Sequence, residues 1–385
     1  MIATLRKEWA LLLGLLTLVV IEASELLTWL LDQSASLVLG GLSLLSLLVL
    51  ALARRIASQA DHLAEALGEP LGTLVLTASV IVIELALVSS TMLTGESNPT
   101  LARDSMFSVL MIVLTGVKGI TLILASRFQK QGRDTPMQPE DLAAINQSGA
   151  SAYINLITTM SVLVLVLPNF SQDSLDANYS LPINWLLTLV SIGLYGIFLR
   201  LQVGSYRNLF LDTPEQLALS QGREANAEEH QPSGEVQESV RRHGVLMASG
   251  LLVLVLLAES MGSLIETGIT DLGLPSSLGG LLVGLLVVAP EALNAFQAAG
   301  RGELQRSLNT LYGSSLSTLC LTVPAVLLIG EWTGTEVILG LEPLESVLLV
   351  LTLVLVRPMS GRVNELDGLM LLTVGVVWIA LQLVG

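Results

Sequence analysis

Charged side chains are scarce in this sequence. Asp, Glu, Lys and Arg make up 13% of the 385 residues, whereas a soluble domain carries about 25%. Hydrophobic residues account for 52%, and the mean hydropathy is +0.72. So few charges do not cover the surface of a soluble protein of this size. The composition therefore excludes a soluble protein and indicates an integral membrane protein.

Cysteine, histidine and aromatic residues are scarce as well. The single cysteine, Cys320, lies in an apolar run and has no second cysteine for an internal disulfide. The three histidines, His62, His230 and His243, fall in polar segments, which disfavours a zinc site. The net charge is −15, and no basic stripe with aromatics is present, so nucleic acid is not an expected partner. Motifs for ATP hydrolysis, zinc proteolysis or a nucleophilic serine are absent, so we expect neither a cofactor nor an enzyme.

Apolar runs of about 20 residues, the length of a helix that crosses about 30 Å of hydrocarbon, recur along the chain. Gly, Ser and Thr are scattered inside them, which suits close packing in a helix bundle. The ten-residue alternation of a membrane β-barrel is absent. We therefore predict an all-α membrane protein with about eleven transmembrane helices, over residues 10–30, 37–53, 70–93, 104–126, 150–167, 182–202, 244–261, 276–298, 308–330, 336–356 and 366–384.

The basic residues predict the orientation. If the N-terminus is cytoplasmic, 16 of the 18 Lys and Arg residues fall on the cytoplasmic side. Arg103 falls on the outer side of the membrane, and Lys118 lies within a predicted span. The first apolar run is about 20 residues long, which favours a retained helix over a signal peptide. We expect a multi-pass protein with its C-terminus on the outer side.

An internal repeat links the two halves of the chain. EPLGTLVLTASVIVIELAL at 69–87 places Gly72 twelve residues before Glu84, and SSLGGLLVGLLVVAPEALN at 276–294 places Gly279 twelve residues before Glu291. The same offset of 207 residues aligns SMFSVLMIVLTG, from Ser105, with YGSSLSTLCLTV, from Tyr312. Because five predicted helices separate the two copies, the copies cross the membrane in opposite directions. Inverted repeats of this kind are typical of secondary transporters.

The repeat predicts the organisation of the chain. Residues 1–31 form an extra N-terminal helix, 37–202 the first five-helix repeat, 203–243 an acidic cytoplasmic linker and 244–385 the second five-helix repeat. The linker is interpreted as a solvated connection, with a cation-attracting or sensing element as the alternative.

Glu84 and Glu291 are the candidate functional residues. Each lies about 20 Å from the end at which its predicted helix enters the membrane. An ionised carboxylate at that depth costs about 3 kcal/mol or more, so it is protonated, paired or bound to a cation. Burial raises a carboxyl pKa and a nearby cation lowers it, so cation and proton compete for the same group. The two acids are therefore predicted to bind both the transported cation and the proton.

Oxygen-bearing neighbours could complete the cation site. Calcium binds six to eight hard oxygen ligands, and sodium also prefers oxygen. Pro290 removes a helical hydrogen bond and can free a carbonyl. Helical spacing nominates Thr77, Ser108, Asn294 and Ser315 as supporting residues, with Pro290 for its carbonyls, and Lys118, Glu259 and Thr322 as weaker candidates.

Each of these residues also has a structural interpretation. A serine or threonine in a membrane helix commonly bonds its own backbone. Lys118 could pair with one of the two acids, tune the site or extend its charge to the membrane surface. Glu259 lies near a helix end, where it could simply be interfacial.

The sequence resembles the calcium/proton and sodium/proton antiporters of the cation/calcium exchanger superfamily, in their bacterial branch. The resemblance runs from about residue 60 to the end, through GEPLGTLVLTASVIVIE, NPTLARD at 98–104 and LGGLLVGLLVVAPEALNAFQAAGRGELQRSLNTLYGSSLSTLCLTVPAVLLIG at 278–330. It implies eleven helices, an extra first helix before two inverted repeats, and one essential acid per repeat, here Glu84 and Glu291. It also implies the cytoplasmic membrane of a bacterium.

One departure from the family pattern affects the choice of cation. Better-known exchangers carry a Gly-Asn pair before each essential acid, whereas Val80, Ile81, Val287 and Val288 stand here. Calcium, sodium and potassium therefore all remain candidate cargoes. The predicted function is exchange of a cytoplasmic cation for external protons by alternating access. A cation channel without proton coupling and an intramembrane acid/base enzyme are the alternatives.

Overall fold

The computed structural model describes residues 8–67, 78–79, 81–89, 99–130, 138, 142–170, 181–210, 236–273, 275, 277–334, 337–358 and 361–384, without the side chains of 61, 64–67, 236–239 and 384. The chain divides into two compact units. Unit 1 comprises Met1–Ser105, Gln231–Pro290 and Ala325–Val337, and unit 2 comprises Met106–His230, Glu291–Pro324 and Ile338–Gly385. Most of the predicted acidic linker lies outside the described residues.

The described part of the chain is almost entirely helical. Eight of its helices are long and apolar enough to cross a membrane, and α2 (Trp9–Ser24) and α15 (Pro343–Leu355) are shorter apolar helices. The prediction of an all-α membrane protein is confirmed. The predicted third span, 70–93, lies largely outside the described residues, of which 78–79 and 81–89 are helical.

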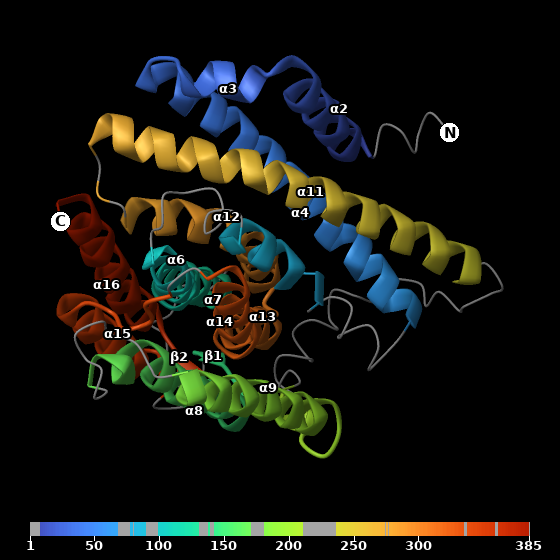
Figure 1. The fold of residues 1–385 in the computed structure, drawn as a ribbon. Helices are drawn as coiled ribbons and strands as arrows, with labels where there is room; N and C mark the ends of the chain where they lie inside the picture. The colour runs from blue at the N-terminus through green and yellow to red at the C-terminus, as the bar shows by residue number, and fades with distance from the viewer. Residues whose placement is uncertain are drawn as a thin grey trace. The chain divides into compact units, whose positions relative to one another are not determined.

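Unit 1 is built around two long helices that lie side by side, α4 (Ala35–Leu67) and α11 (Val236–Leu272) (Figure 1). At 1.5 Å per residue they are about 50 and 55 Å long, well beyond the hydrocarbon thickness. A Cβ added at Gly250 of α11 would lie 2.8 Å from Ile56 of α4, so the two helices approach closely there. Both helices are longer than the predicted spans 37–53 and 244–261, which marked only their apolar parts.

A polar cluster joins the beginning of α2 to the adjacent ends of α4 and α11. Arg55 donates from Nε to Glu8 at 3.0 Å, and Gln59 donates to the same carboxylate at 2.8 Å. The His243 ring is hydrogen-bonded to Gln59, and the His62 ring centroid lies 5.0 Å from that of His243. Because these polar groups satisfy one another, the two long helices can continue past their apolar segments.

Glu8 makes the stability of unit 1 depend on pH. The Arg55 guanidinium holds the pKa of the Glu8 carboxyl below its usual value of 4.5. A depressed carboxyl pKa adds stability above the unfolded-state value, and this stability is lost as the pH falls through the folded-state value. We expect Glu8→Gln to lower the thermal unfolding midpoint at pH 7, by an amount that shrinks below about pH 4.5. An equal deficit at pH 7 and at pH 3.5 would contradict this role.

Two predicted helices differ from the structure. The span 10–30 is two helices, α2 and α3 (Leu26–Leu31), separated by Glu25 at φ 49°. Among the described residues of the span 336–356, the helix begins only at Pro343, and Val337, Leu339 and Leu341 before it are buried in non-helical chain. Pro343 is suited to the first helical turn and disfavours a helical residue before it, which explains this later start.

Glycine permits a close helix contact within unit 1. A Cβ on Gly280, in α12 (Ser277–Gly300), would lie 2.6 Å from the carbonyl carbon of Asp104 and 2.8 Å from the nitrogen of Ser105, both in α6 (Leu101–Met111). Backbone atoms cannot rotate away, so a side chain there forces the helices apart.

We expect Gly280→Ala to destabilise the protein by about 1–3 kcal/mol, the usual effect of overpacking. The matched control is Gly40→Ala in α4, because a Cβ at Gly40 meets no atom within 4 Å. That change removes a flexible residue from a helix and should be neutral or stabilising. Thermal unfolding of both variants in detergent compares them, and equal midpoints would rule out the close contact.

Unit 2 also contains a close helix pair. Helix α7 (Lys118–Lys130) and the preceding π-helical η1 (Ile112–Val117) pack on α16 (Glu365–Val384). A Cβ on Gly368 would lie 2.6 Å from the Gly119 carbonyl oxygen, and one on Gly375 would lie 2.6 Å from the Thr115 hydroxyl. Small residues on both helices therefore allow this approach, as predicted for a tightly packed bundle.

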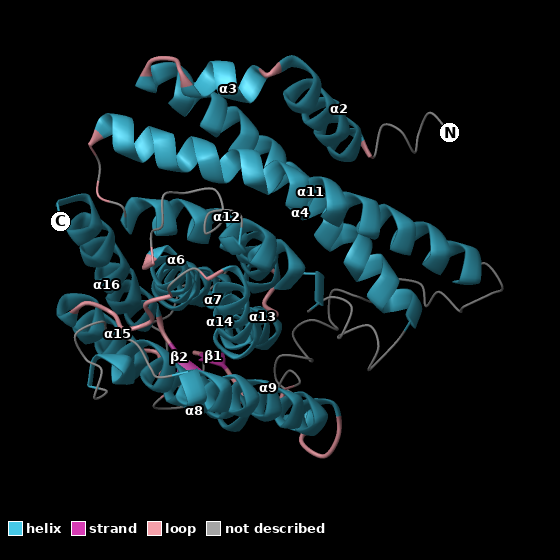
Figure 2. Cartoon of the chain, viewed as in Figure 1, coloured by secondary structure: helices cyan, strands magenta, loops and turns pink. Residues whose placement is uncertain are grey.

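Further segments of unit 2 meet at its two ends. At one end, β1 (Ala143–Ala144) pairs antiparallel with β2 (Arg362–Val363), the strands drawn in Figure 2. Residues 146 and 305 are linked there by a 2.8 Å hydrogen bond. At the other end, Leu341 donates to the Leu165 carbonyl at 2.8 Å.

Unit 2 contains further helical segments. They are α8 (Gln147–Ser161), η3 (Val162–Val166), η4 (Leu167–Phe170), α9 (Leu181–Val203), η5 (Arg207–Leu209), α13 (Leu304–Ser317) and η6 (Thr318–Thr322). Helix α14 (Val323–Thr333) continues from η6, mostly within unit 1.

Candidate cation and proton site

Each unit contains one of the two predicted acids. Glu84 lies in the helical stretch 81–89 of unit 1, where its residue is 1% exposed. Glu291 lies in the part of α12 that belongs to unit 2 and is 6% exposed. A carboxylate this deeply buried is costly unless a proton, a partner or a cation compensates its charge. Both positions therefore have the burial that competitive binding of cation and proton requires.

Pro290 alters the backbone immediately before Glu291. It lies inside α12 and is buried. Having no N–H, it cannot donate the helical hydrogen bond to the carbonyl of Leu286, one turn earlier. That oxygen is a backbone ligand candidate beside the acid. Asn294, predicted as a side-chain ligand one turn further on, is exposed.

The predicted hydroxyl-bearing residues that the structure describes all belong to unit 2. Ser108, Ser315 and Thr322 are buried, with 3%, 0% and 0% exposure. Ser315 donates to the Leu311 carbonyl at 3.1 Å, as the structural interpretation of a membrane serine expects. A hydroxyl that donates to its backbone keeps lone pairs that can accept a cation. Thr77 lies outside the described residues.

The repeat-related helices each contain a π-helical segment, which the sequence analysis did not predict. Thr115 lies in the π-helical segment η1, and Thr322, its partner at the offset of 207 residues, lies in the π-helical segment η6. Segments of this kind are rare and occur frequently at functional sites, because they widen the turn and shift backbone carbonyls. The Thr322 hydroxyl has no hydrogen-bond partner among the described residues. The matched Thr115 and Thr322 were the only sequence signal for this feature.

The structure gives Lys118 a structural contact. Its ammonium group donates to the Val356 carbonyl at 2.7 Å and lies 5.2 Å from the centre of the Tyr312 ring, although the residue is only 4% exposed. The hydrogen bond therefore goes to the end of α15 and not to Glu291 of the same unit. Glu259, the other weak candidate, is exposed on α11.

The chain matches the sodium/calcium exchanger protein family over residues 37–204 and 243–384, two segments that together cover most of it. It is 33% identical over 370 residues to the sodium-potassium/proton antiporter ChaA of Escherichia coli, covering 95% of this chain and 94% of that protein. The chain belongs to the cation/calcium exchanger superfamily. The resemblance in the sequence is thereby confirmed, as is the prediction of a transporter that exchanges cations and not an enzyme.

Other relatives extend the same likeness. The chain is 25% identical over 231 residues to a Ca²⁺/H⁺ antiporter of Synechocystis, covering 58% of this chain and 62% of that one. Its fold resembles native YfkE with a TM-score of 0.64 and 14% identity, covering 93% of this chain and all of the other. It also resembles the H⁺/Ca²⁺ exchanger CAX with a TM-score of 0.62 and 14% identity, covering 97% and 88%. These structures confirm the all-helical fold, and the two segments that match the family model correspond to its two repeats.

Proposed function

We propose that this exchanger moves Na⁺ or K⁺ out of the cytoplasm in exchange for protons, by alternating access. Glu84 and Glu291 bind the cation and the protons competitively. The observation that carries the proposal is one buried carboxylate per unit, at 1% and 6% exposure, at matching positions of the two repeats. The N-terminus lies in the cytoplasm, and the protein resides in the inner membrane of a bacterium.

Competition couples the two flows. When the cation occupies the site, its charge favours ionised carboxylates, and the protons leave. When protons occupy the site, the cation loses its charged ligands and leaves. A buried carboxylate that is ionised and has neither a cation nor a proton is the costliest state. The transporter therefore changes its access with either the cation or protons bound, which prevents a leak of both.

The ligand set favours a monovalent cargo. Calcium binds six to eight oxygens, often including several carboxylates or amides. Here the positions before each acid carry Val80, Ile81, Val287 and Val288, which offer no side-chain oxygen. ChaA, whose name specifies sodium, potassium and protons, is the relative that covers 95% of the chain. Calcium is the second candidate, favoured by the Ca²⁺/H⁺ antiporter among the relatives.

The supporting ligands are proposed to come from Thr77, Ser108, Asn294 and Ser315, with backbone carbonyls near Pro290. The exposed position of Asn294 suits a residue that meets a hydrated ion at the rim of the site. The π-helical segments add further carbonyls near Thr115 and Thr322.

Proton movement in inside-out vesicles tests the proposal. The vesicles contain the full-length protein and are energised to an acidic interior, and sodium, potassium, calcium or magnesium is added in turn. We expect sodium and potassium to discharge the proton gradient. Discharge by calcium alone would replace the proposed cargo with the second candidate. Cation uptake without proton movement would instead show a channel and overturn the antiporter.

A further inference from the structure

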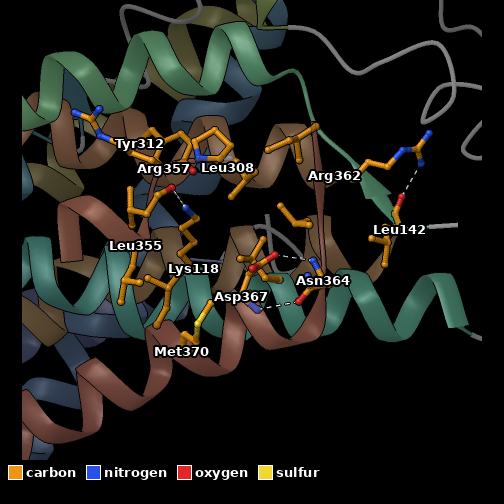
Figure 3. Close-up of a pocket in the computed structure, with 16 residues that line it drawn as sticks. Lys118, Leu142, Leu308, Tyr312, Leu355, Arg357, Arg362, Asn364, Asp367 and Met370 are labelled. Atoms are coloured by element: carbon orange, nitrogen blue, oxygen red, sulfur yellow. Dashed lines mark hydrogen bonds between the residues drawn. The ribbon is translucent and has the colours of Figure 1, made fainter. Parts of the chain in front are cut away.

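Lys118 is a buried cation that the proposed exchange does not use. Its residue is 4% exposed and lies in unit 2, at the point where the π-helical segment η1 passes into α7. It reaches into a cavity of about 180 Å³, lined mainly by residues of α7, α13, α16 and the chain that follows α15 (Figure 3). A buried charge is costly unless neighbouring groups compensate it for the loss of water. The partners of Lys118 therefore show what its charge holds together.

The ammonium group has three partners of different kinds. It donates to the Val356 carbonyl at 2.7 Å and lies 5.2 Å from the centre of the Tyr312 ring, whose face attracts a cation. It also interacts electrostatically with the Asp367 carboxylate. Val356 directly follows α15, and a carbonyl at a helix end lacks an intrahelical donor and carries negative partial charge. One ammonium group therefore links α7 to α15, α13 and α16.

The backbone of the same residue closes η1. The Lys118 N–H donates to the Val113 carbonyl, five residues earlier, and also to the Thr115 carbonyl. The five-residue bond is the one that defines a π-helical turn. It competes with the ordinary α-helical bond, which would go to the carbonyl of Leu114. Because π-helical turns are rare, contacts outside the turn are needed to favour them. A side chain that is fixed at Lys118 supplies such a contact and holds the register of η1.

The register of η1 decides which of its carbonyls a cation can reach. Moving the bond of the Lys118 N–H from Val113 to Leu114 would move it by about 100° around the helix axis. The set of carbonyls without a helical donor would change with it. Thr115 lies within η1, and its partner in the second repeat, Thr322, lies within η6. A change of register would therefore alter one of the two matched segments and leave the other as it is.

Tyr312 connects Lys118 to the second repeat. It lies on α13 three residues before Ser315, one of the supporting residues of the proposed site. Residues at this spacing are neighbours on the surface of a helix. The contact between Lys118 and the Tyr312 ring therefore fixes the helix that follows η1 against the helix that precedes η6.

We propose that Lys118 is a positioning residue of the exchanger. Its ammonium group, held between the end of α15, the start of α16 and α13, keeps η1 in the π-helical register that the cation site requires. This role rests on the proposed function, because it concerns the carbonyls that η1 adds to that site. Lys118 neither touches the transported cation nor carries a proton of the exchange. It is a fixed internal cation, present at every stage of the transport cycle.

The test compares two variants with a matched control, all in the full-length protein. Lys118→Met keeps an unbranched side chain but has no charge and no donor, and Asp367→Asn removes the carboxylate charge but keeps an oxygen. The control is Lys130→Met, since Lys130 lies on the same helix but is exposed, where it pairs with Glu365 at 2.7 Å. Deuterium uptake by the backbone of residues 112–118 is measured in detergent. Initial rates of cation transport are measured in proteoliposomes, with the cation that the wild type transports.

We expect deuterium uptake in η1 to be about tenfold faster in Lys118→Met than in the wild type, because the π-helical turn loses its tie. The half-saturating cation concentration should rise about tenfold, the usual effect of removing a group that orients metal ligands. The maximal rate should be retained, because the acids that carry the protons are intact. Asp367→Asn should show the same two changes to a smaller extent, and Lys130→Met should show neither.

Rescue by a small cation separates a positioning charge from a general loss of stability. Lys118→Ala leaves space beside the carbonyl, the ring and the carboxylate, all of which still attract a cation. Methylammonium, which has N–H donors, should therefore restore slow deuterium uptake in η1 of this variant. Tetramethylammonium at equal ionic strength has no N–H donor and should not. The rescue is measured in detergent, because methylammonium would disturb a proton gradient across a vesicle.

Unchanged deuterium uptake in η1 of both Lys118→Met and Asp367→Asn would overturn the proposal. Faster uptake with an unchanged half-saturating concentration would overturn it too, because Lys118 would then be a structural tie only. If Lys118→Met does not fold, Asp367→Asn decides, since Asp367 is only half-buried. If the wild type exchanges no cation for protons, the proposed function fails, and deuterium uptake alone then decides whether Lys118 holds η1.

Discussion

Replacing either Glu84 or Glu291 with glutamine should abolish cation/proton exchange. Glutamine keeps the size of the side chain and its carbonyl oxygen but carries no charge and takes up no proton at physiological pH. It therefore removes both the counter-charge of the cation and the proton carrier. We expect exchange to fall to the level of vesicles without the protein in each single variant, because one acid alone cannot alternate between the two cargoes.

The matched control is Glu22→Gln. Glu22 also lies in an apolar helix, α2, but it is exposed and precedes both repeats. This variant should exchange at the wild-type rate. Thermal unfolding of all three variants separates a loss of function from a loss of folding. Exchange that survives in Glu84→Gln or Glu291→Gln would show that the acids are structural.

Much of this fold follows from hydropathy and from one internal repeat. The Glu84 and Glu291 segments match in spacing, and the structure adds that Thr115 and Thr322, paired by the same offset, both lie in π-helical segments. A repeat preserves local geometry as well as residue type, because equivalent helices meet equivalent neighbours. Burial of both acids was also predictable, since apolar residues surround each of them in the sequence.

The limits of sequence reasoning are just as specific. Hydropathy marks the part of a helix that lipid can surround, so it could not predict that α4 continues to Leu67 past Arg55. In that extension Arg55 is hydrogen-bonded to Glu8, which is distant in sequence. Lys118 shows the same limit. Its acceptor is the backbone carbonyl of Val356, 238 residues away, and a backbone carbonyl has no signature in a sequence.

Acidification should raise the cation concentration needed for half-maximal exchange by about tenfold per pH unit where one proton competes with the cation, and by up to about a hundredfold where both acids must lose protons. The reason is linkage: if cation binding expels protons, protons must weaken cation binding to the same extent. The measurement is the initial rate of sodium uptake into proteoliposomes at equal pH on both sides, over a series of pH values and sodium concentrations.

The maximal rate at saturating sodium separates competition from general inactivation by acid. If protons and sodium share Glu84 and Glu291, enough sodium restores the rate at every pH at which the protein stays folded. Glu22→Gln should show the same slope as the wild type, since Glu22 is exposed outside the repeats. A half-saturating sodium concentration that does not change with pH would show that sodium and protons bind at different groups. In that case the acids would not be the shared site, and the coupling would have to arise from protonation elsewhere in the chain.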